Sequence, residues 1–196
     1  MTDKAIEIGI LALQGDFIEH DNILRSIGVK PRLVKLPKHL TGLDGLIIPG
    51  GESTTIGKLA AAYGLINPLR QFGRERAIWG TCAGAIFLSK DAERDQPLLE
   101  MMDIQVQRNA FGRQVDSFEI DLKAPFLENG EDEPYHAVFI RAPIIKSVSG
   151  EAKGLLFLPD GRIIAAQQGN LLATSFHPEL TADTRFHQYF VELATS

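Results

Sequence analysis

The chain has 196 residues, of which 44% are hydrophobic and 23% are charged. This length fits one domain whose core needs no disulfide or metal, and the composition excludes a disordered or fibrous protein. Twenty Lys and Arg residues against 25 Asp and Glu residues give a net charge of −5 without a basic block, so nucleic acid is not expected as a partner. The longest apolar run, residues 77–88, is shorter than the roughly 18 residues that span a bilayer, so no membrane partner is expected either.

The first half of the chain alternates strand-like and helix-like segments. Short apolar runs at residues 6–13, 32–36, 46–48 and 77–80 predict buried strands. Amphipathic spacing and end signals predict helices over residues 17–26, 53–63, 68–76 and 83–90. Buried strands that do not alternate in polarity, separated by amphipathic helices, predict a parallel sheet covered on both faces.

The second half is richer in strands. Strand-like segments lie at residues 104–107, 118–122, 137–141, 144–148, 155–158, 163–166 and 171–175. Asp160-Gly161 between two of them is a hairpin signal, so antiparallel strands should extend the sheet or form a β-rich lobe. Residues 184–193 are expected to form a C-terminal helix, and residues 123–133 a loop too short to link two domains.

The segment Gly80-Thr-Cys-Ala-Gly84 connects an apolar strand to a helix and contains the one cysteine of the chain. A single cysteine cannot form an internal disulfide, which favours a reducing, cytoplasmic setting. In α/β hydrolases this tight turn carries the nucleophile, and flanking glycines relieve the clashes of its strained backbone. A lone cysteine is more often a small buried residue. Here the N–H groups that open the helix would favour the Cys82 thiolate and donate to an oxyanion, so we expect a nucleophile.

A thiolate nucleophile needs a general base, and His177 is the best candidate among the five histidines. It follows a strand, and Glu179 lies two residues further on, which in an extended segment projects to the same side. Glu179 can therefore orient the ring nitrogen that does not face Cys82. Packing at a strand start is expected for His136, and solvent exposure for His20, His39 and His187.

Residues 49–53, Pro-Gly-Gly-Glu-Ser, end the third predicted strand, at the sheet edge where ligands collect. Glycine permits close backbone approach, so the Gly51 N–H could form part of an oxyanion hole. Residues 57–58, Gly-Lys, suggest a phosphate-binding loop, but that pattern needs glycine at Glu52 and Ser or Thr at Leu59. No Cys/His cluster has metal-ligand spacing, so we expect neither a metal nor a cofactor.

The Cys82 turn and the His-Pro-Glu segment together resemble the class I, triad-type glutamine amidotransferases. Five segments are similar to the glutaminase subunits of two-component pyridoxal 5′-phosphate synthases: LALQGDFIEH at 11–20, GGESTT at 50–55, RNAFGR at 108–113, FIRAP at 139–143 and SFHPE at 175–179. The resemblance implies one glutaminase domain over residues 1–196. It also implies a three-layer, flavodoxin-like α/β fold with a mostly parallel central sheet, helices on both faces and added antiparallel strands in the second half.

The resemblance implies a role for each matching residue. Cys82 is the nucleophile, His177 the base and acid, and Glu179 the orienting carboxylate. The N–H groups of Gly51 and Ala83 form the oxyanion hole. An arginine fork suits the α-carboxylate of a glutamine substrate. The residues expected to bind glutamine are Gly51, Glu52, Ser53, Arg108, Ile140 and Arg141.

The implied reaction is hydrolysis of L-glutamine to L-glutamate and ammonia through a thioester on Cys82. Ammonia in neutral water is mostly ammonium and not nucleophilic, so it should pass within a complex. The resemblance implies that the recipient is a barrel-fold synthase subunit, which makes pyridoxal 5′-phosphate from two sugar phosphates in a large hetero-oligomeric ring. It also implies weak activity until the partner docks, which a flip of the peptide at residues 49–51 would explain.

Other interpretations keep some of these features. The same triad occurs in other stand-alone glutaminase subunits, such as the one in histidine biosynthesis, which the LALQGDFIEH start disfavours. A γ-glutamyl hydrolase would act without a partner. A non-catalytic binding module would tolerate the loss of Cys82, and an oxidation sensor would use that cysteine without needing His177.

Overall fold

The computed structural model describes residues 5–93, 95–108 and 117–196 of the chain. The strands of the main sheet are β1 (Glu7–Leu11), β2 (Lys30–Val34), β3 (Gly45–Ile48), β4 (Ala77–Thr81), β5 (Ser89–Asp91), β6 (Met102–Gln107), β9 (Ile144–Val148), β10 (Lys153–Phe157), β11 (Ile163–Gln168) and β12 (Leu171–Thr174). A separate two-stranded ribbon consists of β7 (Ser117–Leu122) and β8 (Tyr135–Ile140). The helices are α1 (Phe17–Ser26), α2 (Ser53–Ala62), α3 (Ile66–Glu75), α4 (Ala83–Leu88) and α5 (Arg185–Thr195), with short 3₁₀ turns η1 (Pro37–Leu40) and η2 (Pro178–Leu180).

The main sheet has a parallel half and a mostly antiparallel half. Its strand order is β2-β1-β3-β4-β12-β11-β9-β6-β5, with β10 paired to β11 off this path. The strands from β2 to β12 pair in parallel, whereas β12, β11, β9 and β6 pair antiparallel. The order of the first four strands is that of flavodoxin-like sheets, which confirms the predicted fold class.

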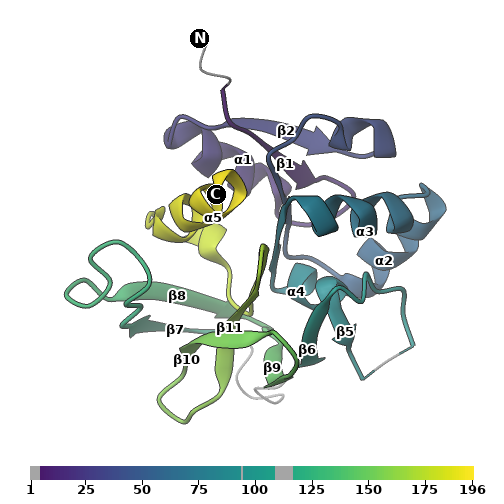
Figure 1. Cartoon of the computed structure of the whole chain (residues 1–196). Helices are drawn as coiled ribbons and strands as arrows, with labels where there is room; N and C mark the ends of the chain where they lie inside the picture. Colours follow the sequence, from purple (N-terminus) through teal and green to yellow (C-terminus); the bar gives the residue numbers. More distant parts are fainter. Residues whose placement is uncertain (1–4, 94, 109–116) are drawn as a thin grey trace.

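Two helical layers cover the parallel half (Figure 1). Alternate side chains of β3 point to opposite layers, because successive residues of a strand face opposite sides. Leu46 and Ile48 belong to the core under α2, α3 and α4, whereas Ile47 belongs to the core under α1 and α5. Trp79 of β4 lies in this second core and contacts Phe186 and Phe190 of α5. Burial on both faces explains why these strands read as continuous apolar runs.

The carboxyl ends of four parallel strands meet at one edge of the sheet. In the register of the sheet, Ile48 at the end of β3 pairs with Gly80, and Thr81 at the end of β4 pairs with Thr174 at the end of β12. The segments that follow β1, β3, β4 and β12 therefore lie side by side, and three of them carry the predicted catalytic and oxyanion residues.

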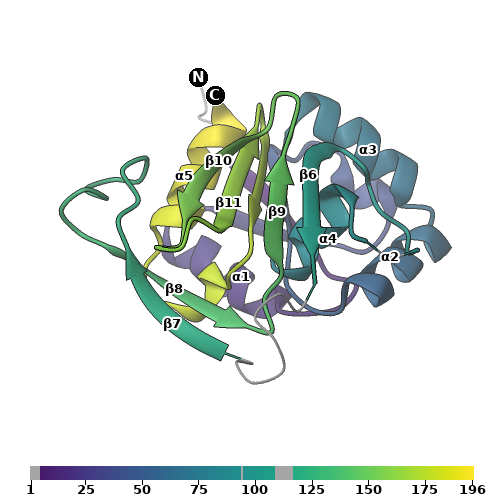
Figure 2. The same ribbon diagram turned by 90° about the horizontal axis from the view of Figure 1, so that it is seen from below.

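The ribbon brings a second set of predicted residues to this edge. In Figure 2 the ribbon lies to one side of the main sheet, with β8 as its inner strand. The Phe118 and Phe139 rings stack at 4.4 Å between centroids. The His177 N–H donates to the Val138 carbonyl at 2.8 Å, which attaches β8 to the segment after β12. Ile140 and Arg141 at the end of β8 are thereby held beside His177.

Some element boundaries differ from the prediction. The predicted helix 83–90 ends at Leu88, because the Ser89 hydroxyl donates to the Ile86 carbonyl at 2.7 Å and the chain continues as edge strand β5. Helix α3 begins at Ile66, before Pro68, since proline is tolerated in the first helical turn. None of the helices in the described part of the chain has the length and apolar character needed to cross a bilayer.

Candidate active site

Cys82 occupies the sharp turn between β4 and α4, with φ of 47° and ψ of −105°. Its N–H donates to the Thr174 carbonyl at 2.8 Å, which fixes the turn to β12. A Cβ on Gly84 would lie 1.9 Å from the Ile48 carbonyl oxygen, and one on Gly80 would lie 2.5 Å from the Gly84 backbone. Both glycines are therefore required by close backbone approach, and the strained conformation expected for the nucleophile is present.

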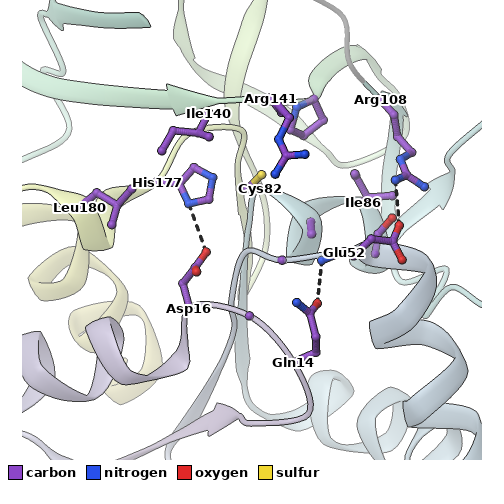
Figure 3. A pocket seen from close by; sticks show the side chains of 15 residues that line it. Gln14, Asp16, Glu52, Cys82, Ile86, Arg108, Ile140, Arg141, His177 and Leu180 are labelled. Atoms are coloured by element: carbon purple, nitrogen blue, oxygen red, sulfur yellow. Dashed lines mark hydrogen bonds and ion pairs between the residues drawn. The ribbon is translucent and has the colours of Figure 1, made fainter. Parts of the chain in front are cut away.

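His177 and Glu179 lie together next to this turn. His177 Nδ1 is 2.6 Å from Glu179 Oε1, and both residues are buried. The expected pairing is present, although its local reason differs, because Pro178 begins the 3₁₀ turn η2 and Glu179 lies within that turn rather than in an extended segment. The Cys82 sulfur lies beside the His177 ring (Figure 3), and the interaction with Cys82 helps to raise the pKa of His177. The three predicted catalytic residues thus lie together at this edge of the sheet.

The charges around His177 favour its protonated form. Burial acts to lower the pKa of His177, but hydrogen bonds and charge interactions with Cys82 and Glu179 outweigh burial and raise it above the ordinary value of 6.5. Burial raises the pKa of Glu179, and the hydrogen bond from His177 opposes that effect. The arrangement suits an imidazolium held between a thiolate and a carboxylate.

Two interlocked loops form the floor beside the triad. After β1, the Asp16 N–H donates to the Gly50 carbonyl at 3.1 Å, and Gln14 Oε1 accepts from the Glu52 N–H at 2.7 Å (Figure 3). Gly51 has φ of 148°, and a Cβ there would lie 2.5 Å from Gln14 Oε1. The loop after β3 therefore depends on glycine both for its conformation and for its close approach to the first loop.

Glu52 is the N-cap of α2 and the partner of Arg108. Its carboxylate accepts from the Thr54 and Thr55 N–H groups at 3.3 and 2.7 Å, and from Arg108 Nη2 at 2.9 Å. Although burial acts to raise it, hydrogen bonds from Thr55 and Arg108 lower the pKa of Glu52 to about 2. Ser53 is buried, and its hydroxyl donates to Gln96 at 3.3 Å.

A cavity of about 510 Å³ joins these parts. Glu179 lies behind His177, outside the cavity lining. Residues 109–113 of the RNAFGR segment lie outside the described part of the chain. The predicted site residues that line the cavity are Gly51, Glu52, Ser53, Cys82, Ala83, Arg108, Ile140, Arg141 and His177.

The structure adds Asp16, which the sequence reasoning did not single out. Its Oδ2 lies 3.6 Å from Nδ1 of His177, so two carboxylates face the same ring nitrogen (Figure 3). Asp16, His177 and Glu179 also offer donor atoms within 4.8 Å of one another, a grouping that ion pairing to the ring explains. The signal was available, since Asp16 follows the first strand at the same edge of the sheet.

The predicted exposure of His20 and His187 is wrong, because both are fully buried. Their helices place them on the inner face, which a pattern that counts histidine as polar does not reveal. His136 is half exposed and contacts Asp121 at 2.7 Å and Glu119 at 3.0 Å, rather than packing in the core. His39 is half-buried.

Comparisons with known proteins agree with this geometry. A model of the SNO glutamine amidotransferase family matches residues 10–196. The pyridoxal 5′-phosphate synthase subunit PdxT of Roseiflexus sp. (strain RS-1) is 56% identical over 190 residues, 95% of this chain and 99% of that protein. The subunit of the same name from Dehalococcoides mccartyi is 52% identical over 193 residues, 96% of this chain and 97% of that protein.

Solved structures resemble the fold. A crystal structure of a glutamine amidotransferase superposes with a TM-score of 0.89 at 48% identity, over 96% of this chain and 99% of that one. A structure of PurLQS from Thermotoga maritima has a TM-score of 0.69 at 14% identity, over 96% of this chain and 98% of that one, which shows the fold alone. The family match over residues 10–196 and relatives that are more than half identical lead to one conclusion: the chain belongs to the SNO glutamine amidotransferase family.

Proposed function

We propose that the chain hydrolyses L-glutamine to L-glutamate and ammonia, and that it supplies the ammonia to a pyridoxal 5′-phosphate synthase subunit. The observation that carries this proposal is the placement of Cys82, in its strained turn, beside the His177–Glu179 pair. The family and the PdxT relatives support the choice of glutamine and of this partner over the glutaminase of histidine biosynthesis.

The first half of the reaction forms a thioester. The Cys82 thiolate attacks the carboxamide carbon of glutamine, and the N–H groups of Gly51 and Ala83 stabilise the oxyanion. His177 Nε2 then gives its proton to the leaving nitrogen, the C–N bond breaks, and ammonia departs. Glu179 stabilises the imidazolium through Nδ1, as the acidic member does in other triads.

The second half regenerates the enzyme. His177, now neutral, accepts a proton from a water molecule that attacks the thioester carbon. The same oxyanion donors serve the second tetrahedral intermediate. Its collapse breaks the C–S bond, releases glutamate and restores the thiolate–imidazolium pair. One water is consumed for each ammonia and glutamate released.

The substrate's two charged ends find complementary groups in the cavity. Arg108 is already paired with Glu52, whereas no ion pair to Arg141 is found within the described residues. We therefore assign the α-carboxylate of glutamine to Arg141, whose fork accepts a carboxylate in bidentate fashion, and the α-amino group to Glu52. Ser53 and Ile140 complete the walls of the site.

In this proposal, docking of the synthase subunit activates the glutaminase by changing the orientation of the Gly50–Gly51 peptide. Because the carbonyl and the N–H of a trans peptide point in opposite directions, the bond from Asp16 N–H to the Gly50 carbonyl turns the Gly51 N–H away from Asp16. A flip of the Gly50–Gly51 peptide has to break this hydrogen bond, and the binding energy of the synthase subunit can offset the free energy that this costs. The reduced thiol that the reaction requires suits the cytoplasm.

The test is glutamate release from L-glutamine by the purified chain, first alone and then with its proposed pyridoxal 5′-phosphate synthase partner. We expect release to rise strongly when the synthase is present and to vanish in Cys82→Ala. Equal activity with and without the synthase would contradict the partner. Activity that persists in Cys82→Ala would contradict the thioester mechanism.

A further inference from the structure

A pair of buried histidines that the proposed mechanism does not use lies behind Glu179. His20 of α1 and His187 of α5 have no solvent exposure, and His20 Nδ1 lies 2.9 Å from His187 Nε2. The opposite nitrogen of His20, Nε2, lies 3.5 Å from Glu179 Oε2 and 3.4 Å from the Thr81 hydroxyl. A continuous line of side chains therefore leads from the cavity through Glu179 into the core.

The second oxygen of Glu179 needs a donor. Oε2 is fully buried, and no hydrogen-bond partner within normal geometry is found for it among the described residues. A buried carboxylate oxygen without a donor is costly, and Nε2 of His20 faces it from the ion-pair distance of 3.5 Å. A shift of about 0.5 Å would turn this contact into a hydrogen bond, and catalytic hydrogen bonds are often long before substrate binds.

The hydrogen bond between the two rings couples their tautomers and allows two arrangements of the protons. If His20 carries its proton on Nε2, its Nδ1 accepts from His187 Nε2–H, and His187 Nδ1 is left as a bare acceptor. The reverse arrangement turns the lone pair of His20 Nε2 toward Glu179 Oε2. It also leaves an N–H on His187 Nδ1, which has no partner within the part of the chain that the structure describes. A buried N–H without a partner is rarer than a bare acceptor, so the first arrangement is favoured.

Burial keeps both rings neutral, as this arrangement requires. Burial lowers the pKa of His187 to about 3. Burial lowers the pKa of His20 well below its ordinary value, and electrostatic interactions with His187 and His177 act in the same direction. Each ring therefore holds one proton at neutral pH, and the hydrogen bond between the rings makes the tautomer of one determine that of the other.

We propose that His20 is a positioning residue for the triad: its Nε2–H holds Glu179 Oε2 so that Oε1 faces His177, and His187 fixes the tautomer of His20. Glu179 lies in the short turn η2 rather than in a long helix or strand, so its carboxylate gains orientation from this contact. The inference deepens the proposed function and rests on it, since orienting Glu179 matters only if His177 acts on Cys82.

Two amide substitutions separate a donor at Nε2 from a merely polar residue. The amide nitrogen of His20→Gln can reach the position of Nε2, whereas that of His20→Asn reaches only the position of Nδ1. With the synthase present, we expect His20→Asn to lower kcat about tenfold with KM unchanged, and His20→Gln to keep most of kcat. Equal kcat in both variants, or an effect on KM alone, overturns the proposal.

A second readout does not depend on the substrate. Cys82 is the one cysteine, so alkylation of the full chain by iodoacetamide reports its thiolate alone. We expect slower alkylation in His20→Asn and a near-wild-type rate in His20→Gln. If this pattern appears while the wild-type complex releases no glutamate, the proposed function fails and the positioning role stands. If the wild type is active and both variants alkylate alike, the positioning role fails.

A measurement on the wild-type chain removes any dependence on how the variants fold. Nitrogen-15 NMR of the histidine rings assigns each tautomer directly, and we expect Nε2–H at His20. A proton on Nδ1 of His20 overturns the proposal. For the variants, the fluorescence of Trp79, the one tryptophan, reports the state of the core, because its ring meets both histidine rings edge-on at 5.9 and 5.0 Å between centroids.

Discussion

Asp16 and His177 form an ion pair of 3.6 Å on the ring nitrogen that Glu179 contacts at 2.6 Å. The Asp16 carboxylate also raises the pKa of Glu179, after the larger effect of burial. Removing the charge in Asp16→Asn should lower the pKa of Glu179, which must be ionised to stabilise the imidazolium. The acid limb of the pH profile of kcat/KM should therefore move to lower pH, by less than about one unit.

The control for Asp16→Asn is Asp21→Asn, which removes a carboxylate that pairs with Arg25 on α1 at 2.6 Å. This variant should leave the acid limb in place. A limb that moves to higher pH in Asp16→Asn would mean that Asp16 contributes mainly by stabilising the imidazolium of His177 rather than by opposing the ionisation of Glu179.

The assignment of the α-carboxylate to Arg141 predicts a binding defect. Arg141→Gln should raise KM for glutamine about tenfold or more and change kcat little, because the lost contact is present in both ground and transition states. Arg108→Gln, by contrast, should lower the thermal stability of the chain, since the Glu52 carboxylate loses its partner at 2.9 Å. Steady-state kinetics of the complex and thermal unfolding of the chain measure the two effects. An unchanged KM in Arg141→Gln would rule out the assignment.

Replacing Gly84, two residues after Cys82, should destabilise the fold. A Cβ on Gly84 would lie 1.9 Å from the Ile48 carbonyl oxygen, which is backbone in the central sheet. Gly84→Ala should cost on the order of 3 kcal/mol in the free energy of unfolding. Gly28→Ala is the matched control, because Gly28 has φ of 78° but nothing within 4 Å of an added Cβ, and it should cost only about 1 kcal/mol. Urea denaturation measures both, and similar losses would refute the steric explanation.

The buried histidine of α5 predicts a dependence of stability on pH. The pKa of His187 in the folded chain is lowered to about 3 by burial, so below its ordinary value of 6.5 the unfolded chain takes up a proton that the folded chain does not. Stability should fall by up to about 1.4 kcal/mol for each pH unit between 6.5 and 3. His187→Gln should make this slope shallower without abolishing it, because the lowered pKa of His20 still makes stability depend on pH.

The control for that slope is His136, whose contribution to stability changes with pH in the opposite direction. Its contacts with Asp121 and Glu119 raise its pKa, so the stability that it contributes is present below 6.5 and is lost as pH rises through the raised value. The ring is 45% exposed, so solvent screening keeps this contribution small. Unfolding midpoints at several pH values compare His187→Gln with His136→Gln. Equal slopes in the two variants would contradict the assignment.

The sequence predicted the elements whose signals are local. The apolar runs of β3 and β4 and the glycines around Cys82 follow from burial on both sheet faces and from backbone clearance, and both appear in the sequence as short patterns. The contact between His177 and Glu179 was also predictable, since two residues in a short segment cannot separate far. The reason given for it was incomplete, because the 3₁₀ turn at Pro178 depends on how β12 ends.

The features that the sequence did not predict arise from tertiary contacts. Edge strand β5 forms because β6 offers a free edge, not because Ser89–Asp91 has strand-like composition. His20 and His187 are buried because α1 and α5 pack on the same face of the sheet, and no local pattern tells that two polar rings will meet there. Asp16 reaches His177 only because β1 and β12 end at the same edge.

The parallel half of the main sheet, its antiparallel half and the ribbon each position different residues of the site. The proposed nucleophile, its proposed base and the proposed oxyanion glycine follow the parallel strands β4, β12 and β3, whereas Arg108 follows β6 and Ile140 and Arg141 lie at the end of β8. In the proposed function, the thioester chemistry therefore depends on the parallel strands, whereas the α-carboxylate of glutamine is bound at the end of the ribbon. Exchanging only the β7–β8 ribbon should therefore change how the α-carboxylate is bound while leaving β3, β4 and β12 in place, provided that the new ribbon keeps a carbonyl that accepts from the His177 N–H.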